Sequence, residues 1–339
     1  MRPSQPERWT VFRLSALGDL VLTTGPLAWW NARRGLRFTV VTRDRLAPVL
    51  AGHPAVDEVI GLDETRLSSE PWPAVARELA ARCRGTGLLD LHGTLRSRVL
   101  GAFWNGPVRR YPKFNLSRRL FQRTRLDLLR RRLEALNVPQ RYSLALESTA
   151  PLPGELLPLI RLTTEERETG RELAVRAGAA PGFLALHPYA THPDKAWPRE
   201  HWATLASRLD EAGIPWIVVG RDAAPLLPDD PRDLTNATDL RALCALLAQA
   251  GALVTNDSGP MHLASAVGTP VVGLFGPTAR AWGFYPAGPR DRILERDLPC
   301  RPCSLHGGTP CAEGRVCLTA IDPREVLEAA QGVLDGKKG

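Results

Sequence analysis

Apolar positions along this chain group into short runs rich in β-branched residues, separated by segments with helical periodicity. Strands are predicted by the runs at 9–14, 38–42, 56–62, 87–91, 183–188, 214–220, 252–256 and 270–276. Helices are predicted between them, the clearest at 163–177, 199–211, 240–249, 258–267 and 323–334. Because strands that alternate with helices are typical of parallel sheets, we predict an α/β protein with two Rossmann-like, doubly wound halves.

A segment rich in proline and small residues separates the two alternating regions, from about Asn137 to Pro158. We interpret it as a linker. The predicted domains are residues 1–150 and 151–322, followed by a closing helix and tail at 323–339. Ligands of such sheets bind beyond the carboxyl ends of the strands, so we expect the functional site in a cleft between the halves.

The composition excludes several classes of protein. Hydrophobic residues make up 44% of the chain and charged residues 24%, which is ordinary for globular proteins and unlike disordered or collagen-like chains. No run approaches the roughly 18 apolar residues of a membrane-spanning helix. Met1 to Glu7 is polar and contains no cleavable leader, so we expect a cytoplasmic protein.

The formal net charge of +8 suits nucleic acid, an anionic membrane surface or a phosphorylated substrate. Residues 109–132 hold ten basic residues and one acid, Asp127, with leucines between them. They permit one helix with an apolar stripe and a cationic face, which could meet a phosphorylated glycolipid or an anionic leaflet, or remain solvated. Nucleic acid is disfavoured as a partner because no known nucleic-acid module is present.

Asp19 lies at the end of the first predicted strand, where the next helix begins. A carboxylate at this edge could act as a general base towards a substrate hydroxyl. The alternative is an ordinary helix N-terminal aspartate that is favoured by the helix dipole. The dinucleotide fingerprint G-x-G-x-x-G is absent from this turn.

A second candidate site follows the strand at 252–256 and opens the next helix. Free amides of Ser258 and Gly259 at a helix N-terminus are suited to phosphate. Asp257 is better suited to sugar hydroxyls or to bracing the loop. His262 lies one turn further on and could reach an anion or pack in the core.

A third candidate site is the loop from His187 to Pro198. Lys195 is one of four lysines among 44 basic residues, and its ammonium group would suit a diphosphate. Thr191 supplies a neutral donor in the same loop. The alternative for Lys195 is a solvated loop side chain.

Four of the six cysteines fall within 18 residues, at Cys300, Cys303, Cys311 and Cys317. Their thiolates could hold a structural zinc. The second pair lacks a tight knuckle, so free or redox-active thiols remain the alternative. Cys83 and Cys244 fall in helical patterns and are expected to be buried.

Together these segments resemble glycosyltransferase family 9, the bacterial lipopolysaccharide heptosyltransferases. The resemblance is carried by RLSALGDLVLTTGPL (13–27), LDLHGTLRS (89–97), the loop 187–198 and above all NDSGPMHLASAVGTPVVGLFGPT (256–278). The cysteine-bearing tail at 300–326 is also similar to the tail of many members.

The resemblance implies a GT-B fold and an inverting transfer of heptose from ADP-heptose to the phosphorylated inner core of lipopolysaccharide, with no metal required for catalysis. It implies that the acceptor is held by the N-terminal half and the donor by the C-terminal half, and that the enzyme works at the cytoplasmic face of the inner membrane. Asp19 would be the general base. The donor-binding residues would be Thr191, Lys195, Asp222, Asp257, Ser258, Gly259 and His262, and the acceptor-binding residues Gly18, Arg96, Lys113 and Arg118.

Three other functions remain open at this stage. The same fold could transfer another nucleotide-activated sugar to a different envelope glycan. A non-catalytic relative that binds glycan or membrane would require a degraded Asp19 or donor loop, whereas Asp19, Lys195, Asp257 and Gly259 are all present. A nucleic-acid binder is suggested by charge alone.

Overall fold

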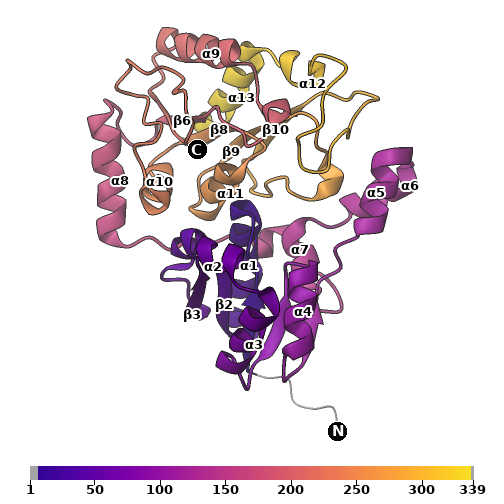
Figure 1. Cartoon of the computed structure of the whole chain (residues 1–339). Helices are drawn as coiled ribbons and strands as arrows, with labels where there is room; N and C mark the ends of the chain where they lie inside the picture. The colour runs from indigo at the N-terminus through magenta and orange to yellow at the C-terminus, as the bar shows by residue number, and fades with distance from the viewer. Residues whose placement is uncertain (1–6, 337–339) are drawn as a thin grey trace. The chain divides into compact units, whose positions relative to one another are not determined.

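The computed structural model describes residues 7–336, so the predictions made for residues 1–6 and 337–339 lie outside the described residues. The chain forms two compact units. The N-terminal unit is Met1–Lys113 with Val138–Arg161, and the C-terminal unit is Phe114–Asn137 with Leu162–Gly339. Each unit is built on a parallel sheet, as predicted, and each sheet has five strands where four were predicted (Figure 1).

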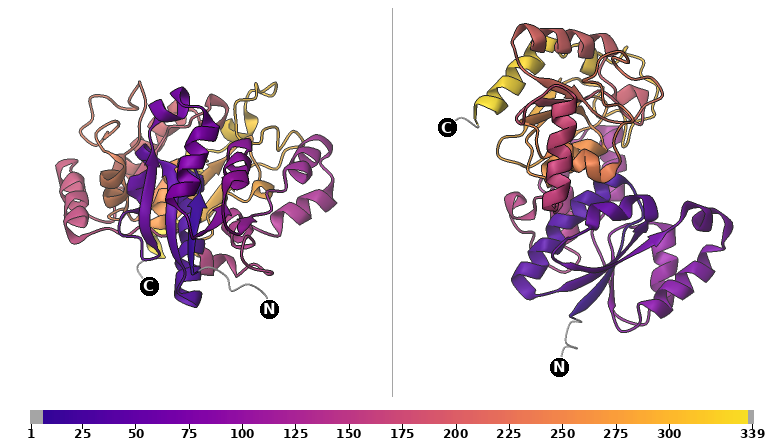
Figure 2. Two further views of the ribbon diagram at one scale, coloured as in Figure 1. Left: turned by 60° about the horizontal axis from the view of Figure 1, so that its bottom comes forward. Right: turned by 90° about the vertical axis from the view of Figure 1, so that its left-hand side faces the viewer.

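The N-terminal sheet has the strand order β3-β2-β1-β4-β5. Its strands are β1 (Arg8–Phe12), β2 (Arg37–Arg43), β3 (Val56–Leu62), β4 (Gly87–Asp90) and β5 (Val108–Arg110). The α-helices of the unit are α1 (Leu17–Arg34), α2 (Glu64–Ser69), α3 (Trp72–Arg82), α4 (Leu95–Phe103) and α7 (Val138–Ser143), with 3-10 helices η1 (Asp44–Leu50) and η2 (Pro153–Leu156). Figure 2 shows this sheet with helices on both of its faces.

The C-terminal sheet has the strand order β10-β9-β8-β6-β7. Its strands are β6 (Leu184–His187), β7 (Trp216–Val218), β8 (Ala252–Asn256), β9 (Val271–Phe275) and β10 (Arg292–Glu295). The helices are α5 (Asn115–Thr124), α6 (Asp127–Glu134), α8 (Thr164–Arg176), α9 (Arg199–Glu211), α10 (Leu240–Leu247), α11 (Gly259–Ala266), α12 (Val316–Thr319) and α13 (Pro323–Asp335), with η3 (Pro193–Lys195) and η4 (Arg280–Trp282).

The central strands are continuous apolar runs because helices cover both faces of each sheet. All five residues of β8 and of β9 are buried. The two predicted structural cysteines, Cys83 and Cys244, are buried as expected. The strands that the pattern missed, β5 and β10, are short edge strands with charged ends, where the apolar signal is weak.

The predicted linker is wrong. All six residues of α7 are buried, and α7 packs against α1 and η2 within the N-terminal unit. Gly25 of α1 permits the close approach of η2, because a Cβ there would lie 2.2 Å from the Leu156 carbonyl oxygen. The proline-rich segment is therefore packed structure of the N-terminal unit.

The boundary at residue 150 also differs from the observed division. Residues 109–132 do not form one helix, since Arg125 takes a left-handed conformation (φ 57°) between α5 and α6. These two helices leave the N-terminal unit and pack against η4, so the chain passes between the units more than once. The predicted closing helix is present as α13, and it packs on α9 and β8 as part of the C-terminal unit.

Among residues 7–336, every helix is too short or too polar to cross a membrane.

Candidate active site

Each sheet has one place where the strand order reverses, and there the loops at the carboxyl ends diverge to leave room for a ligand. In the N-terminal sheet this place lies between β1 and β4, and in the C-terminal sheet between β6 and β8. The predicted residues nearest these places are Asp19 in the first unit and Lys195, Asp257 and Ser258 in the second.

Asp19 lies in the first turn of α1, directly after β1. One carboxylate oxygen pairs with the Arg13 guanidinium at 2.5 Å and accepts a hydrogen bond from the Tyr142 hydroxyl at 3.0 Å. The other accepts from the Ala16 amide at 3.2 Å, so Asp19 is also a helix N-terminal aspartate. Its side chain stays 20% exposed, whereas that of Arg13 is 6% exposed.

The surroundings of Asp19 keep it ionised. Burial by itself raises the pKa of this carboxyl, but the charge of Arg13 and the hydrogen bonds from Ala16 and Tyr142 lower the pKa below its usual value. Arg13 is fixed in turn by a hydrogen bond to the Leu91 carbonyl beyond β4, and Tyr142 stacks edge-on against Tyr111. The network therefore presents a charged, oriented carboxylate.

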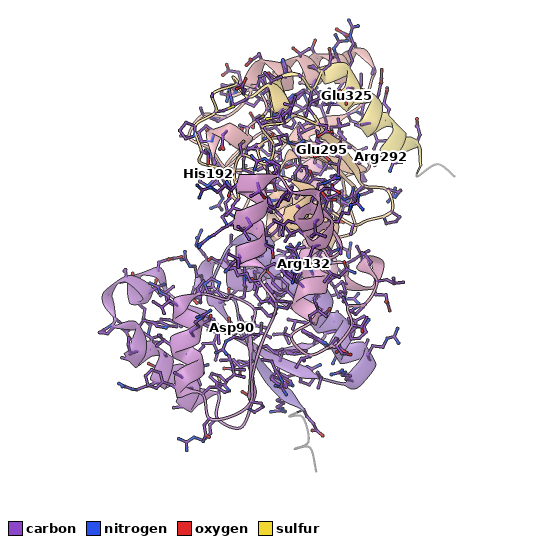
Figure 3. The ribbon with its side chains drawn as sticks, turned by 90° about the vertical axis from the view of Figure 1, so that its right-hand side faces the viewer. Asp90, Arg132, His192, Arg292, Glu295 and Glu325 are labelled. Carbon is purple, nitrogen blue, oxygen red and sulfur yellow. The ribbon has the colours of Figure 1, made fainter. Side chains whose placement is uncertain are left out.

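Predicted acceptor residues of the N-terminal unit lie at the same edge of the sheet. Gly18 is buried in the first turn of α1. The Lys113 ammonium donates to the carbonyls of His92 and Gly93, at 3.1 and 3.3 Å, in the loop after β4. Arg96 lies in the first turn of α4, with its guanidinium over the Trp72 ring. Figure 3 labels Asp90, the last residue of β4.

Arg118, the fourth predicted acceptor residue, lies on α5 of the C-terminal unit and is 8% exposed. Its guanidinium donates to the Trp282 carbonyl of η4 at 3.1 Å. Lys113 and Arg118 fall in one basic stretch of the sequence, but the division between the two units lies between Lys113 and Phe114.

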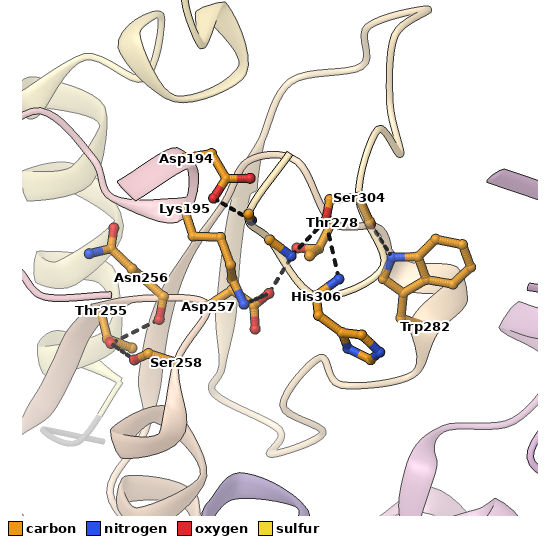
Figure 4. Close-up of polar contacts among 12 residues, drawn as sticks. Asp194, Lys195, Thr255, Asn256, Asp257, Ser258, Thr278, Trp282, Ser304 and His306 are labelled. Atoms are coloured by element: carbon orange, nitrogen blue, oxygen red, sulfur yellow. Dashed lines mark hydrogen bonds and ion pairs between the residues drawn. The ribbon is translucent and has the colours of Figure 1, made fainter. Parts of the chain in front are cut away.

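In the C-terminal unit, Lys195 and Asp257 form an ion pair at 2.7 Å (Figure 4). Their side chains are 14% and 12% exposed, so Lys195 is not a solvated loop lysine. Asp257 also accepts a hydrogen bond from the Thr278 hydroxyl at 2.8 Å. Because an ammonium group has three N–H donors, Lys195 can keep this pair and still donate to an anion.

Ser258 is the N-cap residue of α11, and Gly259 is the first residue of that helix. The Ser258 hydroxyl lies 3.1 Å from the Thr255 hydroxyl and 3.2 Å from His187 Nδ1. Burial lowers the pKa of His187 to about 4, so its imidazole is neutral at neutral pH. Since the Thr255 hydroxyl donates to the Asn256 carbonyl, an Nδ1–H on His187 can donate to Thr255 and leave the Ser258 proton for a ligand.

The remaining predicted donor residues differ in their surroundings. Thr191 is exposed in the loop after β6. Asp222 is exposed after β7, and its carboxylate accepts from the Ala224 amide at 2.9 Å, which closes a turn. His262 is 5% exposed, with its ring 6.3 Å from that of Phe284, so it packs in the interior as the alternative interpretation expected.

The cysteine-bearing tail covers the Lys195 loop. The Gly308 amide donates to Asp194 Oδ1 at 2.9 Å, and a Cβ at Gly307 would lie 2.8 Å from Lys195 Cδ. The Ser304 hydroxyl braces the same tail by accepting from the Gly307 and His306 amides. The tail thereby restricts where the Lys195 side chain can lie.

The four tail cysteines are not gathered as a ligand set. Among residues 7–336, no group of three or more His, Cys, Asp or Glu side chains is placed to hold a metal ion. Burial raises the pKa of the Cys317 thiol to about 11 and also raises the pKa of Cys303, so both are protonated at neutral pH when no metal is bound. The four thiols are free in this structure, and structural zinc stays a prediction that elemental analysis tests.

Several residues of these sites were missed from the sequence. Arg13 could have been found from the sequence, because a charged residue directly after a buried strand needs a partner. Tyr142 could not, since it lies in the segment interpreted as a linker. His187 and Thr278 act through neighbours that are remote in sequence, Ser258 and Asp257.

The sites and the sheets define a glycosyltransferase with the GT-B fold. Residues 88–309, more than half of the chain, match the model of glycosyltransferase family 9 (heptosyltransferase), and the chain belongs to this family.

Its relatives include lipopolysaccharide heptosyltransferase 1 of Pseudomonas aeruginosa, which is 28% identical over 96% of this chain and 98% of the relative. Lipopolysaccharide heptosyltransferase 2 of Escherichia coli is 34% identical over 154 residues, which cover 42% of this chain and 43% of the relative.

Solved structures give the same fold. A family 9 glycosyltransferase from Veillonella parvula superposes with a TM-score of 0.77 at 22% identity, covering 98% of both chains. The E. coli ADP-heptose lipopolysaccharide heptosyltransferase II gives a TM-score of 0.73 at 23% identity, covering 98% of this chain and all of that one. The predicted fold class and enzyme class are confirmed.

Proposed function

We propose that this enzyme transfers heptose from ADP-heptose to the phosphorylated inner core of lipopolysaccharide, with inversion, at the cytoplasmic face of the inner membrane. The observation that carries the proposal is the division of charge between the two sheets. An ionised, partly exposed carboxylate lies at the edge of the first, and a lysine with a helix N-terminus lies at the edge of the second.

In this mechanism Asp19 accepts the proton of the acceptor hydroxyl as the hydroxyl oxygen attacks the anomeric carbon of the donor sugar. The bond from that carbon to the β-phosphate oxygen breaks, and a nucleoside diphosphate leaves. Proton transfer neutralises Asp19, so Arg13 stabilises the carboxylate before transfer more than after it. The network that orients the base therefore also weakens it.

The departing diphosphate gains negative charge, which we propose that Lys195 and the amides of Ser258 and Gly259 stabilise; the ion pair of Lys195 and the start of α11 at Ser258 support this role. We propose that Asp257 orients Lys195 for this role and that Thr191 adds a neutral donor. Asp222 is a candidate contact for the nucleoside. His262, which is buried in α11, would hold the N-terminal turn of that helix in position. These groups supply the positive charge that a divalent cation supplies elsewhere, so turnover should persist in EDTA.

The acceptor side is proposed to use Lys113 and Arg96, two cations of the N-terminal unit. Both lie at the carboxyl edge of β4 and suit phosphate groups on the inner core. Gly18 is buried in the first turn of α1, and we propose that its lack of a side chain lets the acceptor approach Asp19. Arg118 supports this arrangement only indirectly, because its guanidinium is engaged with Trp282.

The test is a thermal-shift comparison of ADP, UDP, GDP and CMP, followed by transfer from ADP-heptose to a deheptosylated lipopolysaccharide core. ADP should stabilise the chain most, and heptose should appear on the core. A preference for UDP or GDP, or ADP binding with no transfer, would contradict the proposed donor or acceptor while leaving the fold unchanged.

A further inference from the structure

Helices α5 and α6 form a hairpin, Asn115–Glu134, that is attached to the C-terminal unit along one side (Figure 1). Phe121 and Leu133 are buried in a cluster with Ala281 and Trp282 of η4. The rings of Phe121 and Trp282 meet edge-on, with centroids 5.9 Å apart. The inner side of this α5–α6 hairpin is thus the side that packs on η4.

The outer side of the α5–α6 hairpin carries leucines that are not needed for this packing. Large hydrophobic side chains are exposed at eight positions among residues 7–336, and four of them lie here: Leu116, Leu120, Leu126 and Leu128. Leu116 is 71% exposed and Leu128 is 80% exposed. Half of the exposed large apolar side chains therefore fall on twenty residues, which is unlike the scattered distribution of an ordinary surface.

Arginines lie among these leucines. The hairpin holds seven arginines and two acidic residues. On α5, Leu116, Arg119, Leu120 and Arg123 follow the spacing i, i+3, i+4, i+7, and all are exposed, so they form one stripe along the helix. On α6, Arg131 and Arg132 are exposed beside Leu128, and Figure 3 labels Arg132.

We propose that the α5–α6 hairpin docks on the anionic face of a lipid bilayer. Exposed leucines would enter the boundary between headgroups and acyl chains, while arginine stems lie along it with their guanidinium groups on lipid phosphates. Charge selects this occupant. A second copy of the chain would bring two strongly cationic hairpins together, which repel, whereas an anionic leaflet attracts them.

The inference deepens the proposed function and rests on it for its purpose, since a lipid-linked acceptor lies at such a surface. Binding to vesicles requires neither donor nor acceptor. If the chain binds vesicles but transfers no heptose, the proposed function is contradicted and this inference is not. If the chain transfers heptose but does not bind vesicles, only this inference is contradicted.

The experiment is co-sedimentation of the full chain with phosphatidylglycerol vesicles and with phosphatidylcholine vesicles. We expect binding to the anionic vesicles that weakens as salt rises. The combined variant Leu116→Ser, Leu120→Ser, Leu128→Ser should bind at least about tenfold more weakly, because it loses the apolar contact. Arg119→Gln with Arg123→Gln should lose about fivefold per arginine.

The matched control is Val175→Ser with Arg176→Gln, an exposed apolar and basic pair on α8 of the same unit. It should bind vesicles like the parent chain. ADP binding by every variant establishes that the C-terminal unit is folded. Equal binding to both vesicle types, no binding, or binding unaffected by the hairpin variants would overturn the proposal. Sedimentation velocity tests the alternative occupant, a second copy of the chain. A dimer of the parent chain that is absent in the leucine variant would also overturn the proposal.

Discussion

The two sheets place opposite charges at equivalent edges. Beyond β1, the side chain left partly exposed is the carboxylate of Asp19, and a more deeply buried cation, Arg13, holds it. Beyond β6 and β8, Lys195 and Asp257 form an ion pair in which both side chains stay slightly exposed, and we propose that Lys195 is the group that meets an anion. Under the proposed function, the same topological position serves a base in one unit and an anion-binding group in the other.

The largest effect should come from removing the base. We expect Asp19→Asn to lower turnover by about 10²–10⁴-fold, because the amide cannot accept the acceptor proton. ADP affinity should be unchanged, since Asp19 belongs to the other unit from Lys195. Initial rates and calorimetry on the same preparation measure both quantities. Retained turnover would remove Asp19 from the role of base.

The next effect concerns the cation of the second sheet. Lys195→Ala should weaken ADP binding about 10–100-fold, since hydrogen bonds to charged groups contribute roughly 1.5–3 kcal/mol. Isothermal calorimetry measures the change. Lys113→Ala is the matched control, because Lys113 lies in the N-terminal unit and should leave ADP affinity intact. Equal losses of ADP affinity in both variants would contradict the proposal that the nucleotide binds to the C-terminal unit.

The difference between the two edges also explains what the sequence could reveal. Asp19, Lys195 and Ser258 were found because each follows an apolar run at the carboxyl end of a predicted strand. Their partners were harder to find. Tyr142 reaches Asp19 across 123 positions of sequence, and no local period marks such a pair.

The fold was predictable where burial imposes a pattern and unpredictable where packing is irregular. Eight strands are marked by runs rich in apolar and β-branched residues, but α7 is buried without any helical periodicity, and the proline-rich composition around it resembled a linker. The prediction of one helix for residues 109–132 was wrong for a related reason. The pattern permitted one helix with a single apolar stripe, whereas two helices form, with Leu116, Leu120 and Leu126 exposed and Phe121 and Leu133 on the packed side.

A smaller effect should follow from disturbing the tail that covers Lys195. Gly307 has φ +93°, and a Cβ would lie 2.8 Å from both Lys195 Cδ and His192 Cβ. Gly307→Ala should therefore displace Lys195 and weaken ADP binding several-fold. Gly182→Ala is the matched control, because its φ of +99° imposes similar backbone strain with nothing within 4 Å. If both variants bind ADP alike, the tail does not position Lys195.

The smallest expected effect on activity comes from Tyr142→Phe. This variant tests most directly whether buried partners set the charge at each sheet edge. The Tyr142 hydroxyl stabilises the charged form of Asp19, so its removal should raise the pKa of that carboxyl. Since Asp19 acts as a base only when ionised, the acidic limb of kcat/KM should move to higher pH. The shift should be at most about one pH unit, because about 1.4 kcal/mol corresponds to one unit and water can partly replace the hydroxyl.

Tyr285→Phe is the control for this shift, since the Tyr285 hydroxyl donates to Glu295 in the other unit. It should leave the acidic limb in place. A Tyr142→Phe enzyme with lower kcat but an unmoved limb would mean that Tyr142 supports the fold around α7 without tuning Asp19. A limb that moves to lower pH would contradict the hydrogen bond's stabilisation of the carboxylate, and with it the argument that buried partners set the charge of each edge.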